Sequence, residues 1–183
     1  MPVSVTASPL AEILILEPKV WKDERGFFLE SFNERDFLRS TTLNPVFIQD
    51  NHSRSQKGVL RGLHYQVQQP QGKLVRVVKG QVFDVAVNLQ RNHRDFGKWF
   101  GTVLSDDNHR QLWIPPGFAH GFITLSEWAD VTYKATDYFS PEYERTLLWN
   151  DPAIGITWPI DFEPILSVKD LNAPNLNHAE LFD

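Results

Sequence analysis

The residues most able to do acid–base chemistry lie in the segment Gly58-Val-Leu-Arg-Gly-Leu-His64-Tyr65. An imidazole titrates near neutral pH and can therefore accept or return a proton under working conditions. A single histidine on an apolar strand more often has a structural role, but its neighbours favour a functional one. Arg61 and His64 would point to opposite faces of a regular strand. Gly62 lies between them and predicts a bulge that would turn both side chains to one side.

A second histidine follows a tight turn in Pro115-Pro-Gly-Phe-Ala-His120-Gly. The Pro-Pro-Gly sequence is first of all a turn signal, and a histidine just after it at a barrel mouth could face a ligand cavity. A mononuclear metal site needs three or four closely placed ligands. Because Tyr65 and Gln66 stand where a second ligand after His64 would be expected, we predict no metal site.

Other polar residues have simpler explanations when each is taken alone. Lys73 and Arg76 read as solvated cations, and the charges of 142–145 and 169–170 read as surface groups. Tyr133 and Tyr138 lie on a late strand, where tyrosines mostly pack, although a hydroxyl aimed into a pocket could donate a proton. The chain carries no Ser-centred nucleophile elbow, Walker loop or Gly-x-Gly-x-x-Gly sequence, so acyl transfer, nucleotide hydrolysis and a Rossmann cofactor lack support.

The composition is that of a globular protein of 183 residues, and we expect one domain over residues 1–183. A net charge of −5 disfavours a nucleic-acid binder. The absence of cysteine excludes disulfides, thiolate metal sites and cysteine nucleophiles. No signal peptide and no run of membrane-spanning length is recognisable, so we expect a cytoplasmic protein that makes no membrane contact.

Short runs rich in Val, Ile and Phe, separated by Gly, Pro and Asn, predict a mainly β protein, either a sandwich or a barrel. Lys79-Gly80 is the strongest hairpin signal. Ser31-Phe-Asn-Glu34 fits a capping box for one helix, with Phe37 and Leu38 packing inward. From Asp151 on, we expect an irregular tail with at most one short helix. The expected strands are Glu12–Leu16, Gly26–Ser31, Val46–Asn51, Val59–Gln66, Lys73–Val78, Gln81–Leu89, Trp99–Leu104, Gln111–Ile114, Gly121–Leu125 and Asp130–Tyr138.

Nine segments, in order along nearly the whole chain, resemble the dTDP-4-dehydrorhamnose 3,5-epimerase family. No single segment is decisive, but the ordered set is specific. They are Asp23-Glu-Arg25-Gly-Phe-Phe-Leu-Glu30, Gln49-Asp50-Asn51-His-Ser, Gly58-Val-Leu-Arg61-Gly-Leu-His64-Tyr65, Gly72-Lys73-Leu-Val-Arg-Val-Val-Lys-Gly, Val82-Phe-Asp-Val-Ala-Val, Phe96-Gly-Lys-Trp, Gln111-Leu-Trp-Ile-Pro-Pro-Gly-Phe-Ala-His120-Gly-Phe, Tyr133-Lys-Ala-Thr-Asp-Tyr138 and Leu166-Ser-Val-Lys169-Asp170.

The resemblance implies a cupin-type jelly-roll barrel with one or two short helices, no metal or cofactor, and a homodimer whose partner helps to complete the pocket. It implies an isomerase (EC 5.1.3.13) that inverts C3 and C5 of dTDP-4-dehydro-6-deoxy-D-glucose, in dTDP-L-rhamnose synthesis for surface polysaccharide. The base falls on His64, its carboxylate partner on Asp170, the acid on Tyr133 and the enolate-stabilising cation on Lys73. Substrate-binding positions fall on Arg25, Glu30, Gln49, Asp50, Asn51, Arg61, Lys73, His120, Tyr138, Glu144 and Lys169, with Tyr138 stacking on thymine.

Three other readings fit the same residues. A 3-epimerase, a 5-epimerase or a 3,4-ketoisomerase of a related nucleotide sugar would use the same scaffold. A metal-dependent cupin oxygenase would bind about one iron or manganese ion per chain. A non-catalytic sugar-binding module would hold the nucleotide sugar without exchanging its protons with solvent.

Overall fold

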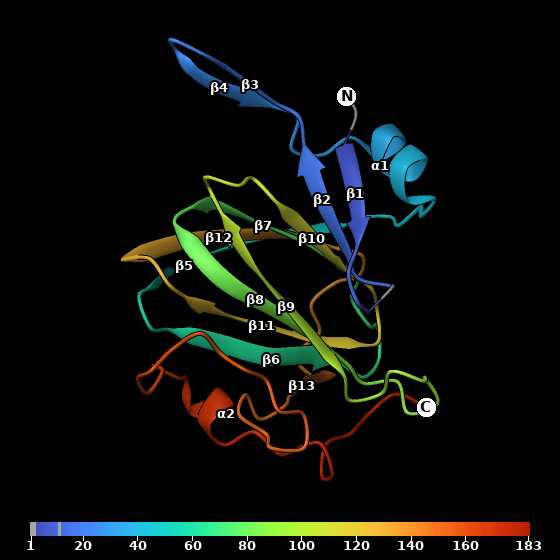
Figure 1. Cartoon of the computed structure of the whole chain (residues 1–183). Helices are drawn as coiled ribbons and strands as arrows, with labels where there is room; N and C mark the ends of the chain where they lie inside the picture. Colours follow the sequence, from blue (N-terminus) through green and yellow to red (C-terminus); the bar gives the residue numbers. More distant parts are fainter. Residues whose placement is uncertain (1–2, 11) are drawn as a thin grey trace.

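The computed structural model describes residues 3–10 and 12–183, which form two antiparallel sheets that face each other (Figure 1). This arrangement confirms the prediction of a mainly β jelly roll. The first sheet has the order β1 (Val3–Ala7), β2 (Leu14–Pro18), β10 (Gln111–Ile114), β7 (Lys73–Lys79), β12 (Trp128–Ala135) and β5 (Gln49–Gln56). The second has the order β13 (Glu144–Thr146), β6 (Leu60–Gln66), β11 (Phe118–Thr124), β8 (Gln81–Asn88) and β9 (Trp99–Ser105).

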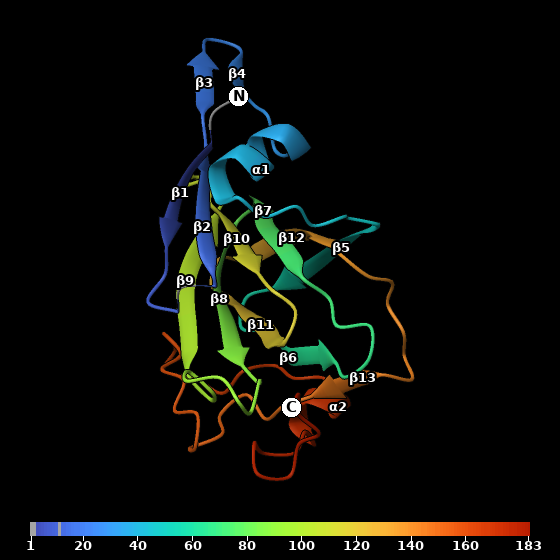
Figure 2. The same cartoon turned by 90° about the vertical axis from the view of Figure 1, so that its right-hand side faces the viewer.

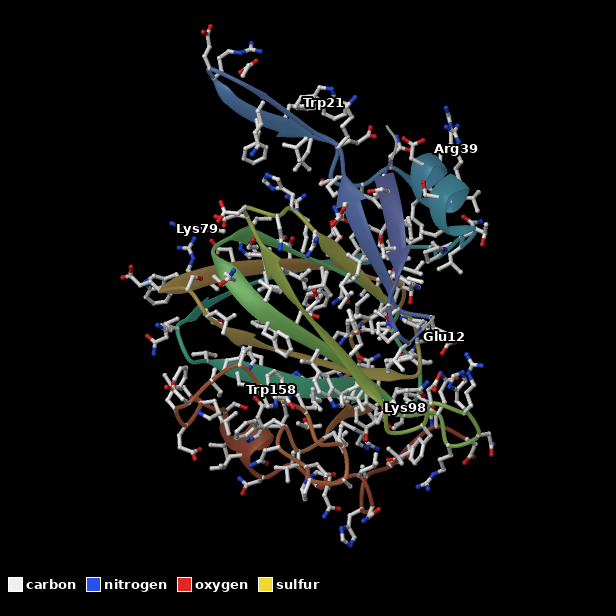
Figure 3. The ribbon with its side chains drawn as sticks, in the orientation of Figure 1. Glu12, Trp21, Arg39, Lys79, Lys98 and Trp158 are labelled. Atoms are coloured by element: carbon white, nitrogen blue, oxygen red, sulfur yellow. The ribbon has the colours of Figure 1, made fainter. Side chains whose placement is uncertain are left out.

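Strand β8 shows how the sequence builds layers on both faces of the second sheet. Its residues alternate, as a strand requires: Val82 and Ala86 join the core between the two sheets, whereas Val85 and Val87 join a second core on the outer face. The C-terminal segment covers this outer face (Figure 2). Trp158 from that segment packs against the sheet, as Figure 3 shows.

Helix α1 (Glu34–Thr41) lies beside β1 (Figure 1), but it begins later than the capping-box prediction. The N-cap is Asn33 rather than Ser31, because the Asn33 side chain accepts a hydrogen bond from the backbone N–H of Asp36. Phe37 packs inward, against Trp113 among others, as predicted. Leu38 does not: its side chain is 41% exposed, because it lies on the outer side of this short helix.

The remaining differences from the predicted elements have physical reasons. Strand β5 continues to Gln56 through alternating polar residues, which an apolar-run criterion misses. Strands β1, β3 (Val20–Asp23) and β13 were not predicted, since each is short and only partly buried. Lys79-Gly80 is a turn with positive φ at Gly80, but not a hairpin: β7 and β8 belong to different sheets. The tail does contain one short helix, α2 (Val168–Leu171).

A two-stranded hairpin of β3 and β4 (Gly26–Leu29) extends away from the barrel, as both ribbon views show (Figures 1 and 2). Phe27 and Phe28 on this hairpin are exposed, and Trp21, labelled in Figure 3, packs against Phe28. The exposure of large aromatic rings to water is unfavourable, and clusters of such rings are typical of surfaces that contact a partner. Among the described residues, no helix is long and apolar enough to cross a membrane.

The predicted bulge at Gly62 is present in β6. His120 of β11 pairs with His64, and Phe122 pairs with Arg61, so β6 has one more residue between these pairs than β11 does. The extra residue brings Arg61 and His64 to the same cavity. Gly62 has φ +124°, and a Cβ there would lie 2.5 Å from the Gly121 Cα atom. Only glycine fits both the backbone conformation and the space.

We predict that Gly62→Ala lowers the free energy of unfolding more than Gly26→Ala does. Gly26 has nearly the same φ, +125°, but a Cβ there would meet nothing within 4 Å. Both variants carry backbone strain, and only the first adds a steric overlap, which we expect to cost a further ~1–3 kcal/mol. Urea unfolding of the two variants measures the difference. Equal losses would show that the close packing of Gly62 on Gly121 does not constrain the bulge.

Candidate active site

A cavity of about 250 Å³ opens between the two sheets. Both sheets contribute polar side chains to its wall. From the five-stranded sheet come Arg61 and His64 of β6, His120 of β11 and Glu144 of β13, and from the six-stranded sheet come Asn51 of β5, Lys73 of β7 and Tyr133 of β12. The cavity therefore collects predicted site residues that are far apart in the sequence.

His64 is held by a carboxylate from the C-terminal segment. Its Nε2 atom lies 2.6 Å from Asp170 Oδ1. Asp170 is in α2 and only 2% exposed, so the reading of Asp170 as a surface charge is wrong. Ser167 caps α2 and donates a hydrogen bond to Asp170 Oδ2 over 2.7 Å. Because an ionised carboxylate only accepts hydrogen bonds, Nε2 carries the proton and Nδ1 is left as the basic nitrogen.

The pair is electrostatically biased toward a neutral imidazole beside a carboxylate. Burial lowers the pKa of His64 below its ordinary value, although the hydrogen bond and charge of Asp170 act in the opposite direction. The nearby ammonium groups of Lys169 and Lys73 lower it further. Burial alone would raise the pKa of Asp170, but hydrogen bonds from His64 and Ser167 bring it below its usual range. At neutral pH the dyad is therefore ready to accept a proton.

Tyr133 lies on β12, in the sheet opposite His64. Burial, together with the charge of Glu144, raises the pKa of its hydroxyl. The phenol therefore keeps its proton at neutral pH and can donate it. The ring makes an edge contact with His120 at a centroid distance of 6.4 Å. The cavity thus has a base on one wall and a proton donor on the other.

Lys73 is buried, with 7% of the residue exposed, so its reading as a solvated lysine is wrong. Its ammonium donates to the backbone carbonyl of His64 over 3.4 Å and lies 5.8 Å from the centre of the Tyr133 ring. Burial lowers the pKa of Lys73 to about 8, while Asp84 and Glu144 act to raise it. The cation is therefore retained at neutral pH in a place where little water screens it.

A second histidine–carboxylate pair lies at the same cavity: His120 lines it, and Asp84, which sequence reasoning missed, lies behind His120. His120 Nε2 lies 3.0 and 2.9 Å from the two carboxylate oxygens of Asp84. Asp84 occupies an inward position of β8 between Val82 and Ala86. A carboxylate at an inward position of an apolar strand must be paired, and this is the signal that could have revealed it.

Several polar side chains that do not line the cavity form hydrogen bonds or ion pairs with residues that do. Arg61 donates to Ser55 Oγ over 2.8 Å, and Lys169 and Glu144 form an ion pair of 2.8 Å. Gln49 donates to Asn51 Oδ1 over 3.0 Å. The buried Nδ2 atom of Asn51 has no hydrogen-bond partner within the described ranges 3–10 and 12–183 and is available to a ligand.

Several predicted binding residues lie outside this cavity. Arg25 is on the extended hairpin and pairs with Asp23. Glu30 accepts from Asn33 and lines a small separate pocket beside Phe37. Asp50 lines another hollow, on the six-stranded sheet, where it pairs with Lys134. The half-buried Arg76, which had been read as a surface residue, lines that hollow too.

Tyr138 is 61% exposed and does not line the cavity, whereas the next residue, Phe139, does. In the described part of the chain, no group of three or more His, Cys, Asp or Glu side chains is placed to hold a metal ion.

Comparisons with known proteins identify the relatives of this chain. Residues 7–178 match the sequence profile described as dTDP-4-dehydrorhamnose 3,5-epimerase. The proteins of that name from Salmonella typhimurium and Pseudomonas aeruginosa are 56% and 51% identical. The alignments cover 97% of this chain and 97% of the Salmonella protein, and 98% of this chain and 99% of the Pseudomonas protein.

Comparison with solved structures identifies the same family. The dTDP-6-deoxy-D-glucose-3,5-epimerase of Legionella pneumophila, in complex with dTDP-4-keto-L-rhamnose, superposes with a TM-score of 0.95 at 50% identity, covering 97% of this chain and 95% of that one. A 3'-monoepimerase from Streptomyces bikiniensis, in complex with dTDP-quinovose, gives a TM-score of 0.88 at 29% identity, covering 93% and 87%. The fold is therefore shared by enzymes that invert one carbon and enzymes that invert two.

We predict that Asp170→Asn shifts the titration of His64 to lower pH. The hydrogen bond and charge of Asp170 raise the pKa of His64, so their loss leaves burial and the two lysines to lower it further. NMR titration of ¹⁵N-labelled histidine side chains measures the midpoint, with His64→Ala to assign the signal. Asp95→Asn, outside the cavity, is the control and should leave the midpoint unchanged. A midpoint that stays the same or rises in Asp170→Asn would contradict the dyad.

Proposed function

The chain belongs to the dTDP-4-dehydrorhamnose 3,5-epimerase family, and from this premise we propose that it inverts C3 and C5 of dTDP-4-dehydro-6-deoxy-D-glucose to give dTDP-4-dehydro-L-rhamnose. The observation that carries the proposal is the placement of two groups on facing sheets. The His64–Asp170 dyad and the Tyr133 hydroxyl flank one cavity. We assign His64 as the base and Tyr133 as the acid.

The chemistry of the substrate explains why two opposed groups are needed. C3 and C5 both adjoin the C4 carbonyl, so the hydrogen on each is acidified. Removal of one of these protons by His64 Nδ1 gives an enolate. Return of a proton from Tyr133 to the opposite face inverts the carbon. Asp170 orients the imidazole and stabilises the imidazolium that forms, as a carboxylate does in a catalytic triad.

Lys73 supplies the charge that an enolate needs. Its buried ammonium lies between the base and the acid, hydrogen-bonded to the His64 carbonyl and beside the Tyr133 ring. A preorganised cation in a site with little water stabilises developing negative charge more strongly than solvent does. The reaction moves only protons, so this mechanism calls for no redox cofactor or metal.

The remaining polar groups suit the nucleotide diphosphate and the sugar hydroxyls. Arg61 offers paired N–H donors of the kind that bind phosphate oxygens. Asn51, His120 and Glu144 provide donors and acceptors at the cavity wall, and Gln49 and Lys169 provide further ones next to it. We assign Tyr138 to stacking on the thymine ring, and its exposure beside Phe139 leaves its face open to a base.

We further propose that the enzyme is a homodimer in which the hairpin of one copy completes the pocket of the other. Arg25 lies on a hairpin that points away from its own barrel (Figure 1). The exposed rings of Phe27 and Phe28 suit burial against a second copy. In a symmetric dimer each hairpin would meet the same surface of the other chain, so both pockets gain the same residues. Arg25 and Glu30 would then act from the partner.

A substrate with two phosphate groups cannot cross a lipid bilayer unaided, because burying its charges there costs too much free energy. We therefore propose that the reaction takes place in the compartment where its substrate is made, which we take to be the cytoplasm, as a step toward dTDP-L-rhamnose for surface polysaccharide.

Incubation of the protein with the 4-keto sugar nucleotide in D₂O is expected to place deuterium at both C3 and C5, as read by product NMR. His64→Ala should fold but lose exchange at both carbons, because no base remains. His178→Ala changes an exposed histidine outside the cavity and should behave like the parent protein. Deuterium at one carbon alone would support a mono-epimerase instead. A folded His64→Ala protein with full exchange would overturn the assignment of the base.

The dimer is tested by mixing two inactive variants, Arg25→Ala and His64→Ala, after denaturation and joint refolding. If Arg25 acts on the partner's pocket, each mixed dimer has one intact site. Roughly a quarter of the parent activity should then return at equal mixing, because half of the dimers are mixed and one of their two sites works. If Arg25 acts within its own chain, every site keeps one defect and no activity returns.

A further inference from the structure

A buried carboxylate that the mechanism above does not use lies behind a histidine of the cavity wall. Asp84 lies on β8 with none of its surface exposed, and both its carboxylate oxygens face His120 Nε2 at 3.0 and 2.9 Å. A fully buried carboxylate loses several kcal/mol of hydration. Replacing such pairs by apolar residues is often neutral or stabilising. Stability alone therefore gives no reason to retain Asp84 in an otherwise apolar stretch of strand.

The position of the pair links it to the proposed catalytic groups. His120 lies directly opposite His64 in the β6–β11 pairing, and both imidazoles line the cavity. The two histidines are therefore side by side on neighbouring strands, and each is paired with a carboxylate from another element. Because Asp84 accepts at Nε2, the neutral ring must carry its proton there, which leaves Nδ1 as the nitrogen available to a ligand.

We propose that Asp84 is a positioning residue for the epimerisation, which fixes the tautomer and orientation of His120 and balances the Lys73 ammonium at the wall where the enolate oxygen forms. This inference rests on the proposed function. Asp84 does not reach the reacting atoms itself. It acts through His120 by a hydrogen bond and on Lys73 through its charge.

The charges around Lys73 determine in which direction its pKa shifts when the charge of Asp84 is removed. Burial lowers its pKa to about 8, Asp84 and Glu144 raise it, and Lys169 lowers it. The other titratable groups that line the cavity are His52, Arg61, His64, Tyr65, His120 and Tyr133. If the charge of Asp84 is removed, the pKa of Lys73 must fall below about 8. The ammonium is then lost at a lower pH, and the alkaline limb of the rate profile moves to lower pH.

The test compares Asp84→Asn with Asp151→Asn. Asp151 is also a buried carboxylate, and it accepts backbone N–H bonds from Ala153 and Leu176 at 2.9 and 2.6 Å, but it does not line the cavity. Both variants should unfold at lower temperature than the parent. For Asp84→Asn we expect kcat to fall by tenfold or more, by analogy with the Asp-to-Asn change in catalytic triads. Its alkaline limb should move to lower pH, while the limb of Asp151→Asn stays in place.

The tautomer of His120 can be measured in the parent protein, so this test does not depend on whether a variant folds. In the parent protein, ¹⁵N NMR of the ring should show the proton of the neutral form on Nε2, and a neutral ring protonated on Nδ1 would overturn the inference. So would an Asp84→Asn protein that is destabilised like Asp151→Asn but keeps its kcat and alkaline limb. Failure of the proposed function looks different, since the parent itself would then give no exchange with the 4-keto sugar nucleotide.

Discussion

The hydrogen bond between His64 and Asp170 joins two parts of the chain that are 106 residues apart. On one side is β6, whose bulge at Gly62 turns His64 toward the cavity. On the other is a four-residue helix in a segment that has almost no regular structure. So short a helix is not stable alone. It is held by the Ser167 cap and by the apolar contacts that fasten the C-terminal segment to the outer face of the sheet. The proposed dyad therefore depends on the outer core, to which both β6 and the C-terminal segment contribute apolar side chains.

Two sheets that face each other suit an inversion of configuration. An epimerase must take a proton from one face of a carbon and return it to the other, and a cavity between two sheets presents a wall to each face. His120 is buried and His64 is partly buried, and each imidazole is paired with a buried carboxylate, Asp84 and Asp170 respectively. Lys169 and Glu144 form a more exposed ion pair nearby. Because their charges are paired, these ionisable groups can remain in a site that contains little water. Electrostatic contacts are stronger there than in bulk water.

The sequence predicted what local patterns determine. Short apolar runs separated by turn residues located ten strands, with differences at their ends, and a glycine inside a strand predicted the bulge that brings Arg61 to the side of His64. Patterns that depend on distant residues were not predicted. Lys79-Gly80 looks like a hairpin turn because nothing local shows that β7 and β8 belong to different sheets.

The burial of polar residues could not be predicted from local sequence patterns either. Lys73 and Asp170 read as surface charges because their partners are far away in the chain, and only the family resemblance marked them as site residues. Asp84 was not singled out at all, although an acid at an inward position among Val82 and Ala86 requires a partner.

The proposed mechanism needs the base and the acid on opposite faces of the sugar ring. A crystal structure of His64→Asn with the 4-keto sugar nucleotide bound would show both groups against an unreacted substrate. We expect the side chain at position 64 to lie about 3.5 Å from C3 or C5, the Tyr133 hydroxyl to lie on the other face, and O4 to point to the Lys73 ammonium. Tyr133 on the same face as position 64, or O4 turned away from Lys73, would rule out this mechanism.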